Sequence, residues 1–89
     1  MALGPPIATQ RLADLKVGVS SEKDVITALG APAGRGMWRW AGEERPLELR
    51  VYERMRMKSN ELDVSILIVF LKNGIYAGHY WFAANPLLQ

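Results

Sequence analysis

The chain has 89 residues, enough for one domain with a small core, and its 49% hydrophobic and 22% charged residues exclude a disordered protein. A formal net charge of +2 is far below the dense positive field of a dedicated nucleic-acid binder. The absence of cysteine excludes disulfides, thiol nucleophiles and thiolate metal sites, and no apolar run approaches the roughly 18 to 20 residues that a membrane-spanning helix needs.

The N-terminal residues predict a lead-in followed by a short helix. Gly4, Pro5 and Pro6 make residues 1–8 a flexible, non-helical segment. Thr9 is placed to cap a short helix that ends at Leu15. We expect a single domain over residues 9–84, with residues 85–89 as a C-terminal tail.

The run from residue 15 to residue 32 contains a complete helix with its own start and stop signals. Ser21 can cap the first turn, and Asp24 three residues later approximates a capping box. Gly30 is suited to the left-handed position after the helix, and Pro32 prevents its resumption. We therefore predict a helix over about Ser21–Leu29, after a break at Gly18. Its narrow apolar stripe consists of Val25, Ile26 and Leu29.

The chain after Pro32 predicts strands. Met37–Ala41 is a short candidate, and Leu47–Lys58 alternates apolar and polar residues along almost its whole length. A polar loop over residues 59–63 separates it from Val64–Leu71, which is rich in β-branched residues, apolar on nearly both faces and expected to be the central strand.

The last predicted strand follows a two-residue turn. Asn73 and Gly74 are typical of a type I′ hairpin, which leads into a strand over Ile75–Phe82. Asn85 and Pro86 are expected to end it. The order of elements predicts an α+β fold, in which two N-terminal helices pack on a three- or four-stranded antiparallel sheet as a two-layer sandwich.

The strand over residues 47–58 is expected to turn its apolar side to the core and its polar side to solvent. The apolar side comprises Leu47, Leu49, Val51, Met55 and Met57, with Glu53 as the single exception. The polar side holds an arginine stripe, which we interpret as a contact for anionic lipid headgroups or an acidic partner. The alternative is a solvated face that Glu48 and other carboxylates neutralise. The stripe consists of Arg50, Tyr52, Arg54 and Arg56, followed by Lys58.

Two short segments contain more aromatic residues than one small core hides easily. They are Trp38-Arg-Trp40 and Tyr80-Trp-Phe82. Trp40 and Trp81 are therefore candidates for an exposed recognition patch, the alternative being that all these rings pack beneath the helices. Interleaved aromatic and arginine residues also stack on single-stranded nucleic acid, but the net charge of +2 argues against that use.

The sequence contains no convincing catalytic or metal-binding set. His79 is the only histidine, so a zinc site without cysteine would need badly placed carboxylates. The serines lack the context of a nucleophile, and no glycine-rich phosphate loop opens a helix. We expect no enzyme activity, no cofactor, no metal and no small-molecule substrate.

Three motifs together resemble the SmpA/OmlA (BamE-like) family of small bacterial outer-membrane lipoproteins. They are Lys16-Val-Gly-Val-Ser20, Leu29-Gly30-Ala-Pro32 and Val69-Phe70-Leu-Lys-Asn-Gly74. The resemblance implies two helices on a three-stranded antiparallel sheet, and a non-enzymatic role in maintaining the outer membrane or assembling its β-barrel proteins. Its structural residues are Gly18, Ser21, Val25, Leu29, Gly30, Pro32, Asn73 and Gly74.

The resemblance also implies a lipoprotein on the periplasmic face of the outer membrane, tethered by a lipidated cysteine. The sequence shows no signal-peptide pattern and no cysteine. We expect either a trimmed mature domain of such a lipoprotein or a cytoplasmic protein. The expected partner is a membrane-associated envelope protein, bound through the sheet face or the hairpin end. The alternatives are a β-lactamase-inhibitor-like module that binds an enzyme's cleft, and a small cytoplasmic nucleic-acid-binding domain.

Overall fold

The computed structural model describes residues 2–39, 41 and 45–84, so the predicted site residue Trp40 and the tail over residues 85–89 lie outside the described residues. The fold of the described residues is α+β, with three long and two short antiparallel strands, one short α-helix and one 3₁₀ helix. The elements in chain order are β1 (Ala2–Leu3), η1 (Thr9–Asp14), α1 (Glu22–Leu29), β2 (Gly34–Trp38), β3 (Leu47–Lys58), β4 (Glu61–Lys72) and β5 (Ile75–Ala84).

The sheet is antiparallel throughout and is built around β4, which lies between β3 and β5. β3 and β4 pair along almost their whole length, from Glu48 opposite Leu71 to Lys58 opposite Glu61. β2 and the two-residue β1 share the other edge of β3, where they pair with residues 47–51 and 55–56. The prediction that the Val64–Leu71 run is the central strand is confirmed.

Two-residue turns join the three longest strands. At the second turn Asn73 and Gly74 have φ values of 56° and 75°, which confirms the predicted type I′ hairpin. The first turn is tighter than predicted. Only Ser59 and Asn60 lie between β3 and β4, because β4 begins at Glu61 inside the expected loop.

The second helix confirms its predicted boundary signals. The Ser21 hydroxyl accepts a hydrogen bond from the Asp24 N–H at 3.2 Å, and the Asp24 carboxylate accepts one from the Ser21 N–H at 2.9 Å. Gly30 ends α1 with a φ of 88°, a region that favours glycine. The capping box is therefore complete with Asp in the place of the usual Glu or Gln.

The first helix differs from its prediction. It is a 3₁₀ helix over Thr9–Asp14, its N-cap residue is Ala8, and no side chain caps it. Thr9 lies inside the helix and is not its cap. So short a segment has few backbone hydrogen bonds of its own, and it is held by packing of Ile7 and Leu12 against the core.

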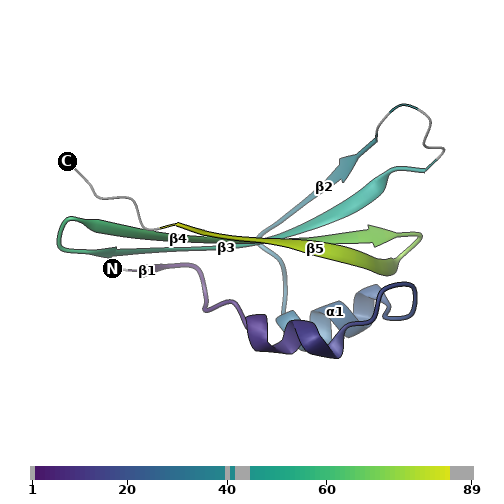
Figure 1. Ribbon diagram of the computed structural model, residues 1–89, viewed down its shortest axis with the longest axis horizontal. Helices are drawn as coiled ribbons and strands as arrows, with labels where there is room; N and C mark the ends of the chain where they lie inside the picture. The colour runs from purple at the N-terminus through teal and green to yellow at the C-terminus, as the bar shows by residue number, and fades with distance from the viewer. Residues whose placement is uncertain (1, 40, 42–44, 85–89) are drawn as a thin grey trace.

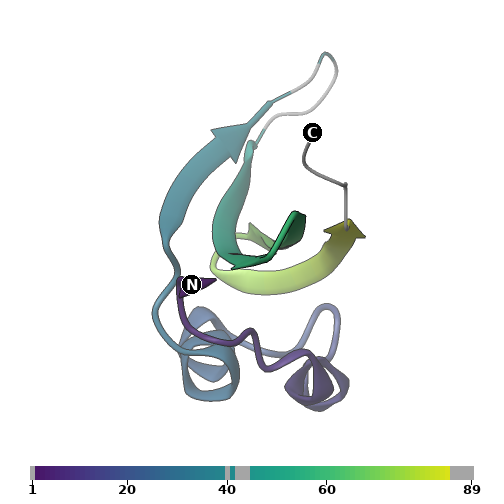
Figure 2. The ribbon, with the colours of Figure 1, turned by 90° about the vertical axis from the view of Figure 1, so that its left-hand side faces the viewer.

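The core lies between the helical segments and one side of the sheet. Figures 1 and 2 show η1 and α1 on the same side of the strands. Cross-strand partners share a face, so Tyr52 with Leu67 and Arg50 with Val69 all point toward the helices. The buried apolar residues are Leu15, Val25, Tyr52, Leu67, Val69, Leu71 and Tyr76.

The predicted orientation of β3 is wrong. Arg50 and Tyr52, which we expected in solvent, are only 7% and 6% exposed, whereas Met55 and Met57, which we expected in the core, are 41% and 46% exposed. The alternation itself is present, but a strand that turns over moves every side chain to the opposite face. The helices therefore cover the face that carries the arginine stripe.

Candidate protein-docking surface

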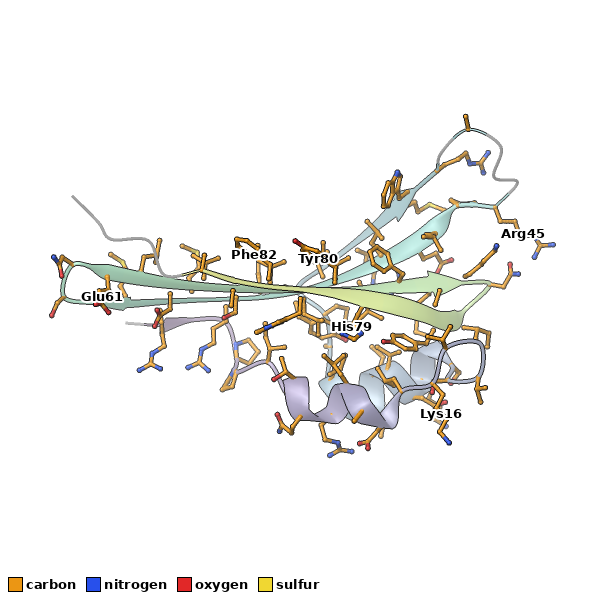
Figure 3. All side chains as sticks on the ribbon, in the orientation of Figure 1. Lys16, Arg45, Glu61, His79, Tyr80 and Phe82 are labelled. Carbon is orange, nitrogen blue, oxygen red and sulfur yellow. The ribbon has the colours of Figure 1, made fainter. Side chains whose placement is uncertain are left out.

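The side of the sheet away from the helices is an apolar surface, which we call the free face. In the register Val51 lies opposite Ile68, and Ile68 lies beside Tyr80 of β5. Figure 3 shows Tyr80 and Phe82 on this side and His79 on the helix side. The free face comprises Leu47, Leu49, Val51, Met55 and Met57 of β3, Leu62, Val64, Ile66, Ile68 and Phe70 of β4, and Tyr80, Phe82 and Ala84 of β5.

Much of the free face is open to solvent. Tyr80 is 57% exposed, Phe82 43% and Met55 41%, and the residues between them are half-buried. Exposed apolar side chains that gather on one face of a protein mark an interaction site. Figure 2 shows the strands curving around this face, with the helices on the outside of the bend.

The free face differs from the usual exposed side of an antiparallel sheet, which is polar. Within the described residues no helix lies over it (Figures 1 and 2). The residues of β4 and β5 that form this face are uncharged, and in the row that β3 contributes between residues 47 and 57 the one charged residue is Glu53. A large patch of this composition is typical of a protein-binding surface.

Arg50 is the centre of a polar cluster on the other side of the sheet. Its Nε donates to the Glu22 carboxylate at 2.6 Å, its Nη2 to the Glu48 carboxylate at 3.1 Å and its Nη1 to the Leu49 carbonyl at 3.0 Å. The hydrogen bond that Arg50 donates to Glu22 raises the pKa of Arg50, against the effect of burial. Arg50 therefore connects α1 to β3 in the interior and offers no surface to a partner.

Tyr52 is likewise an interior contact. Its hydroxyl donates to the Gly30 carbonyl at 2.8 Å, so it ties the end of α1 to the middle of β3. Burial raises the pKa of Tyr52, and the positive charge of Arg50 opposes that shift. The predicted role of Arg50 and Tyr52 as contact residues does not fit their burial.

The two buried tyrosines predict a loss of stability in alkali. Burial raises the pKa of Tyr52 and of Tyr76, so the folded protein holds both phenolic protons more tightly than the unfolded chain does. Their contribution is full below about pH 10, the ordinary tyrosine pKa, and is lost as the pH rises through the higher folded values. Tyr52→Phe removes one of these protons.

We expect Tyr52→Phe to lose about 1 kcal/mol near neutral pH, where its hydrogen bond is missing, and to lose stability less steeply than the wild type in alkali. Urea unfolding at a series of pH values measures both effects. Ser21→Ala, which removes the helix cap at a similar cost of about 1 kcal/mol, is the matched control and should keep the wild-type alkaline slope. Equal slopes for Tyr52→Phe and the wild type would contradict the prediction.

Arg54 and Arg56 lie farther along β3, on the side of the sheet that faces the helices. Arg54 is half-buried, and its Nε has no hydrogen-bond partner in the part of the chain that the structure describes. Arg56 is exposed and lies opposite Asp63. Both line an open pocket of about 390 Å³, and the rest of its lining consists of Asp63, Val64, Ser65, Ala83 and Ala84. Their predicted contact with an anionic partner stays a prediction.

Trp81 is 40% exposed, as its candidate role requires, and pairs with Leu67 in the register. It lies on the helix-facing side of β5, so it is separated from Tyr80 and Phe82 by the sheet. The sequence therefore predicted the aromatic segment of β5 correctly, but of its three aromatic residues it named only Trp81 as a contact and not Tyr80 or Phe82 of the free face.

The motif residues of the family resemblance form junctions between the helical segments and the sheet. The Gly18 N–H donates to the Tyr76 carbonyl at 2.9 Å, and the Gly74 carbonyl accepts from the Glu22 N–H at 3.0 Å. Val25 is fully buried in the core and Leu29 packs against it, while Pro32 is half-buried between α1 and β2. Ser21 bridges to Ile75 at the start of β5.

The described residues contain no group of His, Cys, Asp and Glu side chains that could hold a metal ion. The Tyr76 hydroxyl and the His79 Nδ1 are 2.6 Å apart, and their rings stack at a centroid distance of 6.4 Å. Among the described helices none is long and apolar enough to cross a membrane.

Comparison with protein-family models, with curated proteins and with solved structures found no match to this chain. The resemblance to the SmpA/OmlA family rests on the sequence motifs. Function is therefore inferred from those motifs and from the chemistry of the free face.

Proposed function

We propose that this chain is a non-catalytic interaction module of the bacterial envelope, similar to the SmpA/OmlA lipoproteins, and that it binds a membrane-associated protein through its free face. One observation carries the proposal. The central strand β4 is apolar on nearly both sides over residues 64–71, and within the described residues the helical segments cover only one side of the sheet.

The chemistry of the free face favours a protein as its partner. Tyr, Phe and Met are enriched at the centres of protein interfaces, and Tyr80, Phe82 and Met55 are among the most exposed residues of this face. Nucleic acid and anionic headgroups both require positive charge, which the apolar rows of this face lack. An inhibitor-like module that binds an enzyme's cleft would use the same curved face, and its identity is an outcome of the cross-linking experiment below.

The proposal includes the finer assignment of the fold, two helical segments packed on an antiparallel sheet as in the SmpA/OmlA family. The positions of the motif residues support it, because hydrogen bonds at Gly18, Gly30 and Gly74 join the helical segments to the sheet, with the Gly30 carbonyl accepting from the Tyr52 hydroxyl.

The binding surface is tested by photo-cross-linking in the native cell, with the complete reading frame. A benzophenone amino acid replaces Met55 on the free face or Lys23 on the exposed side of α1. We expect an adduct with a protein of the membrane fraction from position 55 and none from position 23. Equal labelling at both positions, or none at either, would refute docking through the free face.

The compartment is tested separately by cell fractionation and mass spectrometry of the N-terminus. A lipidated cysteine upstream of residue 1, in the envelope fraction, is the expected result. A native start at Met1 in the cytosolic fraction would overturn the envelope part of the proposal while leaving the docking surface to its own test.

A further inference from the structure

The outer edge of β5 is covered along its first half only. The Tyr76 carbonyl accepts a hydrogen bond from the Gly18 N–H at 2.9 Å, and the Tyr76 N–H donates to the Ser20 carbonyl at 2.7 Å. Beyond Gly78 the strand pairs with β4 alone, and no described residue pairs with its other side. Figure 1 shows this half of β5 running past the helices. We call residues 79–84 the open edge.

The open edge lacks the features that protect edge strands. An edge strand presents a row of unpaired N–H and C=O groups, and proteins commonly shield such rows with lysine, proline, bulges or covering segments. The bulge and the covering loop lie in the first half of β5, whereas residues 80–84 read Tyr-Trp-Phe-Ala-Ala and are uncharged. Three large side chains on it, Tyr80, Trp81 and Phe82, are 57%, 40% and 43% exposed.

The opposite edge of the sheet is different. Its strand β2 carries an exposed arginine, Arg35, between Gly34 and Gly36, and glycine is a poor strand former. The uncharged aromatic edge of β5 is therefore the better template for pairing with another chain.

We propose that the open edge pairs antiparallel with the same edge of a second copy, about a two-fold axis at Trp81, and that the chain forms a homodimer with one continuous sheet. A two-fold axis perpendicular to the sheet pairs residues of the same face. Tyr80 of each copy then lies opposite Phe82 of the other copy, and the two Trp81 residues lie opposite each other. Aromatic pairs of this kind stabilise neighbouring strands.

The charge pattern favours a second copy over an unrelated extended peptide. Self-pairing of residues 80–84 brings no charge opposite a like charge, and it fills all three aromatic positions with aromatic partners. It also leaves both free faces on the same side, where they join into one larger apolar surface. The dimer forms through main-chain groups at the edge and not through the free face. The dimer proposal can therefore be wrong while docking through the free face is right, and docking can be wrong while the dimer is right.

The pairing is tested with single cysteines in a chain that has none of its own. Trp81→Cys places two thiols directly opposite each other, where Cβ atoms about 5 Å apart lie close to disulfide geometry. We expect rapid cross-linking of Trp81→Cys under mild oxidation. Met37→Cys, at an exposed site on β2, is the matched control and should remain uncross-linked.

A second pair of variants keeps the test decisive if Trp81→Cys unfolds. Mixed Tyr80→Cys and Phe82→Cys chains should form the mixed disulfide in preference to either homodimer, because the proposed register places these two positions opposite each other. In sedimentation experiments the wild type should show twice the monomer mass and dissociate on dilution, since the paired edge is short. Ala83→Lys should be monomeric at every concentration.

Three results would overturn the proposal. One is a wild type that stays monomeric at all concentrations. Another is a dimer that cross-links through cysteine at Met55 and not through the open edge, which would mean that two free faces pack together. The third is a monomer whose open edge cross-links only to an extended segment of a different protein.

Discussion

Replacing Arg50 by alanine is expected to destabilise the domain by about 2–3 kcal/mol, although a surface arginine would be neutral. The guanidinium is buried and donates to Glu22, Glu48 and a main-chain carbonyl. Removal of one partner from a buried ion pair costs about 3–5 kcal/mol when the remaining charge stays buried. Here the carboxylates of Glu22 and Glu48 are 36% and 38% exposed and become hydrated again in the variant, so we expect a smaller loss than for a fully buried pair.

Urea unfolding near neutral pH measures this loss. Arg56→Ala, on the same face of the same strand but exposed, is the matched control and should change stability by less than about 0.5 kcal/mol. If the two variants were equally harmless, Arg50 would be a solvated residue and β3 would turn its apolar side chains toward the helices.

Replacing Ile68 by glutamate is expected to abolish docking through the free face without unfolding the domain. Ile68 lies in the middle of this face, between Val51 and Tyr80, and is only half-buried. A charge there must be desolvated when an apolar partner binds, so cross-linking from position 55 should fall at least about tenfold. The free energy of unfolding should change by about 1 kcal/mol or less.

The neighbouring residue supplies the control. Leu67 is fully buried on the opposite side of the same strand, so Leu67→Glu is expected to destabilise the domain by more than about 3 kcal/mol. Thermal unfolding and cross-linking of the two variants separate folding from binding. A Leu67→Glu protein as stable as the wild type, or an Ile68→Glu protein that cross-links like the wild type, would contradict the assignment of the two faces.

The elements that the sequence predicted well are those whose signals are local. The capping box of Ser21 and Asp24, the type I′ turn at Asn73 and the exact limits of β3 each depend on residues within a few positions of one another. The 3₁₀ helix was mistaken for a capped α-helix because Thr9 looks like a cap, and only the packing of Ile7 and Leu12 determines its form.

The orientation of β3 could not be read from alternation. A period of two is unchanged when the strand turns over, and the choice between its faces depends on a partner elsewhere in the chain. Here that partner is Glu22, 28 residues before Arg50. Arg50, with Glu22 as its partner, and Tyr52, whose hydroxyl donates to the Gly30 carbonyl, are therefore stable in the interior despite their polarity.

The free face was missed for the same reason, although a signal was present. The sequence showed that the Val64–Leu71 run is apolar on nearly both faces, and a sheet that two short helical segments cover on one side cannot bury both. Combined with the aromatic residues of β5, that pattern indicated an exposed apolar surface. The central position of the strand alone does not explain that pattern.

The contacts that join α1 to the sheet have a consequence for the order in which the chain folds. The β3–β4 and β4–β5 hairpins form between sequence neighbours, whereas Glu22 contacts Arg50 and Gly74, and Gly18 contacts Tyr76. Local pairs close faster than distant ones. The N-terminal third, although synthesised first, therefore completes its contacts with the sheet only after Tyr76 has left the ribosome. Until then the core that contains Val25 and Leu67 is incomplete, and a factor that shields apolar segments during synthesis would act in this interval.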